Sequence, residues 1–186
     1  MKAIETWYDG IRFRSRAEAR EAVFLNHIGV NWRYEHQGFA DDDVAYLPDF
    51  WLPDLHVFLE VKGEYPDHEA IAKAEALAAT NYHAVFIDYG DTTLQPMLRQ
   101  NDSMLCVGAA GFVDSQYWWC ECPYCGLMGI QFQGRADRLP CGCCVERDNL
   151  REQTHDSQKL LEAYEAARSA RFDGKLSRAL AKAVGR

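Results

Sequence analysis

The stretch YLPDFWLPDLHVFLEVKG, residues 46–63, limits the possible folds of this chain more than any other segment. Two apolar runs flank a short polar segment at 53–56, and this arrangement predicts two antiparallel strands joined by a tight loop. In the register set by that loop, Phe50 lies opposite Leu59. Because strand side chains alternate between the two faces, one face of the hairpin is apolar along its whole length, as packing against a core requires.

The opposite face of the same hairpin brings acidic side chains together. In this register Asp49 lies opposite Glu60, and directly opposed Cβ atoms are roughly 4.5–5.5 Å apart. Two like charges so close are unfavourable, which leaves three explanations: one carboxyl stays protonated, Lys62 pairs with both, or a divalent cation bridges them. A surface ion cluster is the alternative to a metal site, but the aromatic neighbours Phe50 and Phe58 indicate that this face is not simply solvated.

A third carboxylate is predicted on the first helix, which the pattern places at residues 15–29. Glu18 shares a helical face with Leu25, at i+7, so an inward-facing Glu18 would reach the hairpin. Ser15 and Glu18 also have the spacing of a capping box, in which Glu18 would only satisfy backbone N–H groups. The residues favour neither role over the other, and Glu21 is the reserve candidate because it points in a similar direction.

The first ninety residues predict an α/β domain with a core of its own. Periodicity and turn residues place a helix at 15–29, strands at 31–39, 45–52 and 57–63, a helix at 67–80 and a strand at 82–90. Residues 91–119 are predicted to add one helix and one or two strands. Elements in this order pack as a sheet flanked by helices, and residues 1–112 are predicted to form this domain.

This helix–strand–strand–strand–helix–strand order, with PD at 48–49 and EVK at 60–62, resembles the PD-(D/E)XK nuclease superfamily. The segment RFRSRAEAREAVFLNHIG, followed by W-x-Y-E at 32–35 and by YLPDFWLP, looks like those of small phage and mobile-element nucleases within it. The resemblance covers residues 11–90 and implies a restriction-endonuclease-like core with a mixed sheet. It further implies a metal-dependent endonuclease that hydrolyses DNA phosphodiester bonds in phage or mobile-element DNA processing or recombination.

The resemblance also implies a role for each candidate residue. Asp49, Glu60 and the backbone carbonyl of Val61 would bind Mg²⁺ or Mn²⁺, and Glu18 would bind the cation directly or through water. Lys62 would orient or deprotonate the attacking water and offset charge on the phosphate. Mg²⁺ typically takes one or two protein carboxylates together with waters and substrate phosphates. The alternative is a non-catalytic nucleic-acid-binding or inhibitory protein of the same fold, although such a protein has no need for opposed carboxylates.

The chain has seven cysteines, and six of them lie between residues 120 and 144. Such clustering favours a metal site over disulfides, which predicts a zinc ribbon over residues 113–150; a redox pair is the rival interpretation. Four thiolates have the spacing of a structural zinc site: Cys122, Cys125, Cys141 and Cys144. The alternative to Cys144 is Cys143, and Cys120 or His155 could also enter the site. A closed site of four thiolates predicts a structural metal rather than a catalytic one.

Residues 151–186 are predicted to be helical and basic. The segment 156–172 has an apolar stripe that includes Leu160 and Tyr164, while the basic side chains of 159–186 either contact phosphates or face solvent. The whole chain is acidic, with a formal net charge of −8, and an acidic protein repels DNA at long range. DNA binding is therefore expected to depend on metal ions, on local basic patches, or on a protein partner or homodimer.

Export and membrane insertion are not expected from the sequence. No apolar run is long enough to span a bilayer, and the N-terminal residues MKAIETWYDG lack the apolar stretch of a signal peptide. A cytoplasmic protein with no membrane partner is therefore expected, in keeping with cysteines that bind metal rather than form disulfides.

Overall fold

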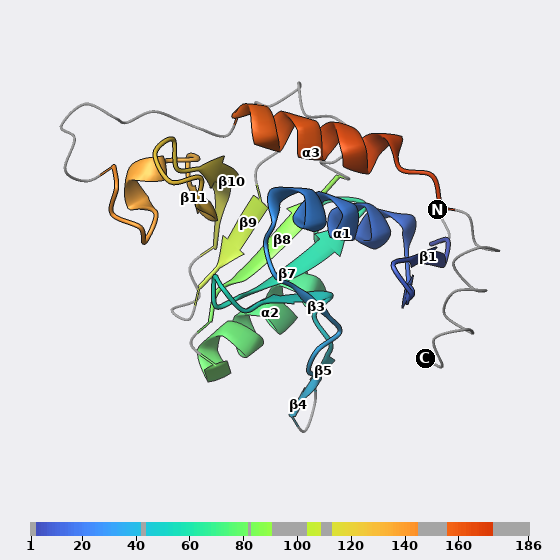
Figure 1. The fold of residues 1–186 in the computed structure, drawn as a ribbon. Helices are drawn as coiled ribbons and strands as arrows, with labels where there is room; N and C mark the ends of the chain where they lie inside the picture. Colours follow the sequence, from blue (N-terminus) through green and yellow to red (C-terminus); the bar gives the residue numbers. More distant parts are fainter. Residues whose placement is uncertain are drawn as a thin grey trace.

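The computed structural model describes residues 3–41, 44–81, 83–90, 104–108, 113–144 and 156–172. These residues form an α/β fold, in which helices cover both faces of a mixed sheet of seven strands (Figure 1). Within the described ranges, no helix combines the length and the apolar composition needed to cross a membrane. The helix predicted near residues 93–100 and the last basic helix, 175–186, lie outside the described residues.

The seven-stranded sheet has one parallel pair near its centre. In spatial order its strands are β11 (Met128–Phe132), β10 (Val113–Glu121), β9 (Met104–Val107), β8 (Val85–Tyr89), β7 (Val57–Lys62), β6 (Phe50–Leu52) and β3 (Arg33–Tyr34). The pair β7–β8 is parallel, and the other neighbouring pairs of this sheet are antiparallel. Helix α2 (His68–Asn81) connects β7 to β8, because parallel neighbours need a crossover between them.

Two hydrophobic layers enclose the central strands. Helices α1 (Arg16–Ile28) and α3 (Gln158–Ser169) lie on one face of the sheet and α2 lies on the other (Figure 1). The α1 and α3 layer buries Leu59, whereas the α2 layer buries Phe58. Consecutive residues of β7 therefore enter different cores, which is why this strand is apolar on both faces along its first half.

The sequence predicted the first helix closely, because its ends carry clear signals. Ser15 is the N-cap and accepts a hydrogen bond from the backbone N–H of Glu18, at 3.1 Å. Gly29 ends the helix in the left-handed conformation, with φ of 75°, and its N–H donates to the carbonyls of Leu25 and Asn26. The cap at Ser15 places the segment just before it, including Arg14, at a fixed position beside the helix.

The hairpin register predicted from the sequence is confirmed. Phe50 pairs with Leu59, and the two flanking pairs of β6 and β7 follow the same register. The predicted strand 45–52, however, is interrupted. It consists of β5 (Val44–Tyr46) and β6, and residues 47–49 leave the ladder between them because Pro48 has no N–H group to donate.

Two further hairpins differ from the sequence expectation. The predicted strand 31–39 is split into β3 and β4 (Phe39–Asp41), and β4 pairs with β5 as a separate two-stranded sheet. An N-terminal hairpin, β1 (Thr6–Tyr8) with β2 (Ile11–Phe13), was not predicted. Its turn has the Asp-Gly pair typical of tight hairpins, at positive φ, so the sequence did contain a signal for it.

The described residues of the three predicted segments, 1–112, 113–150 and 151–186, are joined by shared strand pairing and helix packing. The cysteine-rich hairpin β10–β11 extends the main sheet through antiparallel pairing with β9. A short 3₁₀ helix, Ala136–Arg138, follows β11. Helix α3 packs against α1, where the Phe24 and Tyr164 rings stack 4.6 Å apart. The cysteine-rich segment is thus attached to the core through backbone hydrogen bonds rather than through a linker alone.

Candidate functional site

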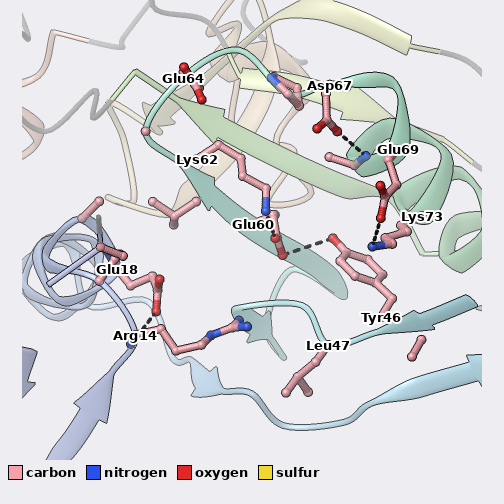
Figure 2. A pocket seen from close by; sticks show the side chains of 18 of the residues that line it. Arg14, Glu18, Tyr46, Leu47, Glu60, Lys62, Glu64, Asp67, Glu69 and Lys73 are labelled. Atoms are coloured by element: carbon pink, nitrogen blue, oxygen red, sulfur yellow. Dashed lines mark hydrogen bonds and ion pairs between the residues drawn. The ribbon is translucent and has the colours of Figure 1, made fainter. Parts of the chain in front are cut away.

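A cleft of about 1320 Å³ opens where the end of β7 meets the first turns of α1 and α2 (Figure 2). The β4–β5 hairpin forms a further wall, so four separate segments contribute side chains. Charged residues from these walls line the cleft: Arg14, Arg16, Glu18, Glu60, Lys62, Glu64, Asp67, Glu69 and Lys73. Three of the four candidate residues, Glu18, Glu60 and Lys62, are therefore brought together around one space.

Asp49 lies directly beside this cleft and is 3% exposed. Its Oδ2 accepts a hydrogen bond from the backbone N–H of Val61 at 2.8 Å, and its Oδ1 forms an ion pair with Nη2 of Arg14 at 2.7 Å. The backbone N–H of Asp49 donates to Oε2 of Glu60 at 3.3 Å. Asp49 is not among the residues that line the cleft, but each of these three partners is.

Glu60 and Lys62 project from the end of β7, and both are visible in the cleft (Figure 2). Oε1 of Glu60 lies 2.6 Å from Nζ of Lys62, while Oε2 accepts a hydrogen bond from the hydroxyl of Tyr46 at 3.1 Å. Glu60 is 5% exposed. The hydrogen bond from the Asp49 backbone N–H thus places the Glu60 carboxylate beside Asp49, beyond the end of the β6–β7 pairing at Phe50, and both side chains are buried.

Glu18 combines the two roles that the sequence left open. Its Oε2 accepts hydrogen bonds from the Tyr34 hydroxyl at 2.5 Å and from the backbone N–H of Arg14 at 3.0 Å. It therefore satisfies a backbone donor just before the helix, as a capping residue does, while it lines the cleft. Glu21, the reserve candidate, instead lines a separate small cavity together with Asp88, and so lies outside this site.

The electrostatics of the site reflect an excess of buried negative charge. Burial raises the pKa of Asp49 well above its usual value, and the charges of Glu60 and Glu18 raise it further. The hydrogen bond from the Val61 N–H and the charge of Arg14 act in the opposite direction without outweighing these effects. Three carboxylates, those of Glu18, Asp49 and Glu60, thus share one neighbourhood, and Arg14 and Lys62 partly compensate their negative charge.

The neighbouring donors stay protonated. Burial lowers the pKa of Lys62, but the charge of Glu60 and the hydrogen bond to it outweigh burial and raise the pKa above its usual value. Burial raises the pKa of Tyr46, and the charge of Glu60 raises it further. Burial and the hydrogen bond to Glu18 act in the same way on the pKa of Tyr34. Both phenols consequently act as hydrogen-bond donors that hold the carboxylates in place.

Sequence reasoning missed Arg14, Tyr34 and Tyr46, although all three contact the predicted residues. Only Arg14 had a local signal, since it immediately precedes the N-cap Ser15 and therefore lies near Glu18. The tyrosines come from strands whose placement depends on the tertiary fold. No periodicity in the sequence indicates that they donate to carboxylates.

The second cluster consists of thiols. Four cysteines have Sγ atoms that lie within 4.8 Å of one another: Cys122, Cys125, Cys141 and Cys143. The cluster could therefore bind a structural metal such as zinc. Tetrahedral zinc with bonds of about 2.3 Å places sulfur atoms about 3.8 Å apart, which this spacing can accommodate. Burial alone raises the pKa of Cys122, but backbone N–H groups of Cys125 and Tyr124 lower it to about 6, which favours the thiolate that a metal needs.

The structure thus favours the alternative ligand Cys143 over Cys144. Gly142, with φ of 66°, reverses the chain between Cys141 and Cys143, so that their thiols face the same cluster. Cys144 is buried, and its Sγ lies 3.8 Å from that of Cys122. Cys120 donates to the carbonyl of Gly129 within the β10–β11 hairpin, and His155 lies outside the described residues.

Comparison with models of protein families, with curated proteins and with solved structures found no match to this chain. Two arrangements of side chains carry the chemical information of the described residues. One is the buried pair Asp49 and Glu60 beside Lys62. The other is the cluster of four thiols beyond the edge of the core.

Proposed function

We propose that this chain is a divalent-cation-dependent DNA nuclease with a restriction-endonuclease-like core of the PD-(D/E)XK type. One observation carries the proposal: Asp49 and Glu60 are buried as neighbours, with Lys62 in contact with Glu60, at the margin of a large cleft. Burying two like charges is costly, and the ion pairs with Arg14 and Lys62 offset only part of that cost. A divalent cation bound between the carboxylates would offset the rest.

The local backbone supports the same assignment. Pro48 ends the ladder of the β6 strand, which frees Asp49 to accept the backbone N–H of Val61 on the neighbouring strand. Glu60 and Lys62 share one face of β7, because residues two apart in a strand point the same way. The interruption at Pro48 and the alternation of side chains along β7 thus bring Asp49, Glu60 and Lys62 together.

Each residue then has a distinct task in phosphodiester hydrolysis. Asp49, Glu60, Glu18 and the Val61 carbonyl would hold Mg²⁺ or Mn²⁺, which when bound supplies Lewis acidity and lowers the pKa of water. Lys62 keeps its proton at Nζ while it is paired with Glu60. Its ammonium group is therefore suited to orient the attacking water and to offset negative charge on the phosphate.

Affinity for DNA is proposed to come partly from outside the cleft. Glu64 and Asp67, which lie between β7 and α2, and Glu69 in the first turn of α2 line the cleft wall, and these acidic side chains repel phosphates. In this proposal the cysteine cluster is the zinc site of a ribbon that supports β10–β11. The ribbon, the basic C-terminal segment, a protein partner or a second copy of the chain supplies the remaining contacts.

Cleavage assays with site variants test this function. Zinc-loaded protein is incubated with duplex, single-stranded and branched DNA and with RNA, in Mg²⁺, Mn²⁺ or EDTA. We expect cation-dependent cleavage of DNA that is lost in Asp49→Ala and Lys62→Ala. Matched controls are Asp54→Ala, which removes an exposed carboxylate from the turn of the same hairpin, and Arg33→Ala, which removes an exposed cation.

Two results would count against the proposal. Equal cleavage by the wild type and by both site variants would remove Asp49 and Lys62 from the reaction. Absence of cleavage on every substrate, with intact DNA binding, would favour the non-catalytic DNA-binding or inhibitory role on the same fold.

A further inference from the structure

Arg14 is the basic side chain that pairs directly with the Asp49 carboxylate at the margin of the cleft. Its Nη2 contacts Oδ1 of Asp49 at 2.7 Å, and its Nε contacts Oε1 of Glu35 at 2.8 Å. The Arg14 side chain lines the cleft, which Asp49 does not, and Figure 2 shows the side chain extending into the space below Glu60. A divalent cation that approaches Asp49 from the cleft therefore meets the guanidinium first.

The backbone around Arg14 is held firmly, whereas its side chain is accessible. The backbone N–H donates to Oε2 of Glu18 and to the Tyr34 hydroxyl, at 3.0 and 3.1 Å. Glu35 has a positive φ of 44°, and its own N–H donates to the carbonyl of Asp49 at 2.8 Å, which fixes it beside the site. The Arg14 side chain is 55% exposed, so its guanidinium can turn without unpacking the core.

A guanidinium and a divalent cation cannot both neutralise Asp49 without repelling each other. A guanidinium also suits phosphate, because its planar fork of donors matches two phosphate oxygens at once. We infer that Arg14 exchanges partners during turnover: it is the counter-ion of Asp49 before a divalent cation binds, and it turns towards the phosphate of the substrate once the cation has replaced it. This inference rests on the proposed nuclease function.

Cation binding without DNA tests the first half of the exchange. Mn²⁺ is titrated into zinc-loaded wild type and Arg14→Gln in an isothermal calorimeter. Removing a competitor worth up to about 1.4 kcal/mol should make Mn²⁺ binding about three- to tenfold tighter in Arg14→Gln. The matched control is Arg12→Gln. It removes an exposed ion pair between Arg12 and Glu5, at the N-terminal hairpin, and should bind Mn²⁺ as the wild type does.

Kinetics in saturating Mn²⁺ test the second half. Arg14→Gln should raise the KM for DNA by about tenfold, because a contact to the phosphate is lost. Arg14→Lys retains the charge but not the fork, so it should bind Mn²⁺ like the wild type and still show a raised KM. Circular dichroism of each variant checks that the fold is intact, and Arg14→Lys provides the test if Arg14→Gln does not fold.

The outcomes separate this inference from the proposed function. Unchanged or weaker Mn²⁺ binding by Arg14→Gln overturns the exchange, since Arg14 would then be a fixed part of the site. An unchanged KM in both Arg14 variants overturns the contact with phosphate. If the wild type binds no Mn²⁺ beyond the thiol cluster, or if Asp49→Ala binds it equally well, the proposed nuclease site itself fails.

Discussion

The Asp49→Asn variant is expected to be more stable than the wild type when no divalent cation is present. Asp49 is buried, and its raised pKa in the folded protein means that folding disfavours its ionised form. The stability of the wild type therefore falls as the pH rises from the usual carboxyl pKa through the raised one. The variant has no such charge, so its advantage should grow over that pH range and vanish below the usual carboxyl pKa.

The magnitude follows from the charges around Asp49. Burial disfavours the ionised carboxylate most, and beside it Glu60 and Glu18 repel Asp49 while Arg14 attracts it, which leaves about one net repulsion. Two unit charges about 4 Å apart interact by about 4 kcal/mol at an effective dielectric constant of about 20. Asparagine can still accept the N–H of Val61, but the loss of charge assistance costs about 1 kcal/mol. After that loss and some solvent screening, we expect a net gain of about 1–3 kcal/mol, or about 2–4 °C in Tm for each kcal/mol.

A bound divalent cation should make the wild type more stable than Asp49→Asn. A cation that binds only the folded wild type stabilises it by about 2.7 kcal/mol at a concentration 100 times its Kd, whereas Asp49→Asn lacks one of the charged ligands. Thermal unfolding followed by circular dichroism, in EDTA and in Mg²⁺ across a range of pH, measures both effects. The control is Asp54→Asn, because Asp54 lies on the exposed turn of the same hairpin, where it accepts from Asn31.

The reasoning is refuted if Asp49→Asn is less stable than the wild type in EDTA at neutral pH. In that case Arg14 and Lys62 compensate the carboxylates fully, and no missing cation is needed to explain the cluster. Equal stabilisation of Asp49→Asn and the wild type by Mg²⁺ would instead place the cation at another site.

Three further predictions concern the cysteine-rich hairpin. Cys143→Ser should lose most of the zinc bound per chain, whereas Cys144→Ser should retain it, as measured by elemental analysis of purified protein; the reverse result would restore Cys144 as the ligand. Removing the metal with a strong chelator should raise amide hydrogen exchange in the cysteine-bearing segments 122–126 and 141–144, while β10–β11, which pairs with β9 and packs into the core, stays protected. Gly129→Ala would place a Cβ 2.5 Å from Cδ2 of the buried Leu139. We expect the free energy of unfolding, measured with denaturant, to fall by about 1–3 kcal/mol. An unchanged denaturation midpoint would indicate that Leu139 moves aside freely.

The sequence predicted those features that follow from local rules. The β6–β7 register was predictable because strand periodicity and loop length leave one arrangement that buries an apolar face, so Phe50 had to oppose Leu59. The first helix was predictable because Ser15 and Gly29 carry opposite capping signals. Clustering of cysteines predicted thiols that could share a metal, since their spacing along the chain is short.

The features that the sequence did not predict depend on distant contacts. The predicted strand 45–52 is broken because Pro48 interrupts a ladder whose partners were unknown from the sequence. The choice between Cys143 and Cys144, which the sequence left open, depends on the left-handed Gly142: this turn brings Cys143 into the group of four thiols, and a spacing rule does not specify it.

The sequence alone therefore determined the β6–β7 register, in which Phe50 opposes Leu59 and Asp49 comes close to Glu60, because alternation and loop length are local properties of one hairpin. Only the tertiary structure decided what surrounds them. Arg14 reaches Asp49 from 35 residues away, and Tyr34 reaches Glu18 from 16 residues away, because packing of separate elements brings them together. Charge compensation at a buried site is a property of the whole neighbourhood, so it emerges only when the chain is folded.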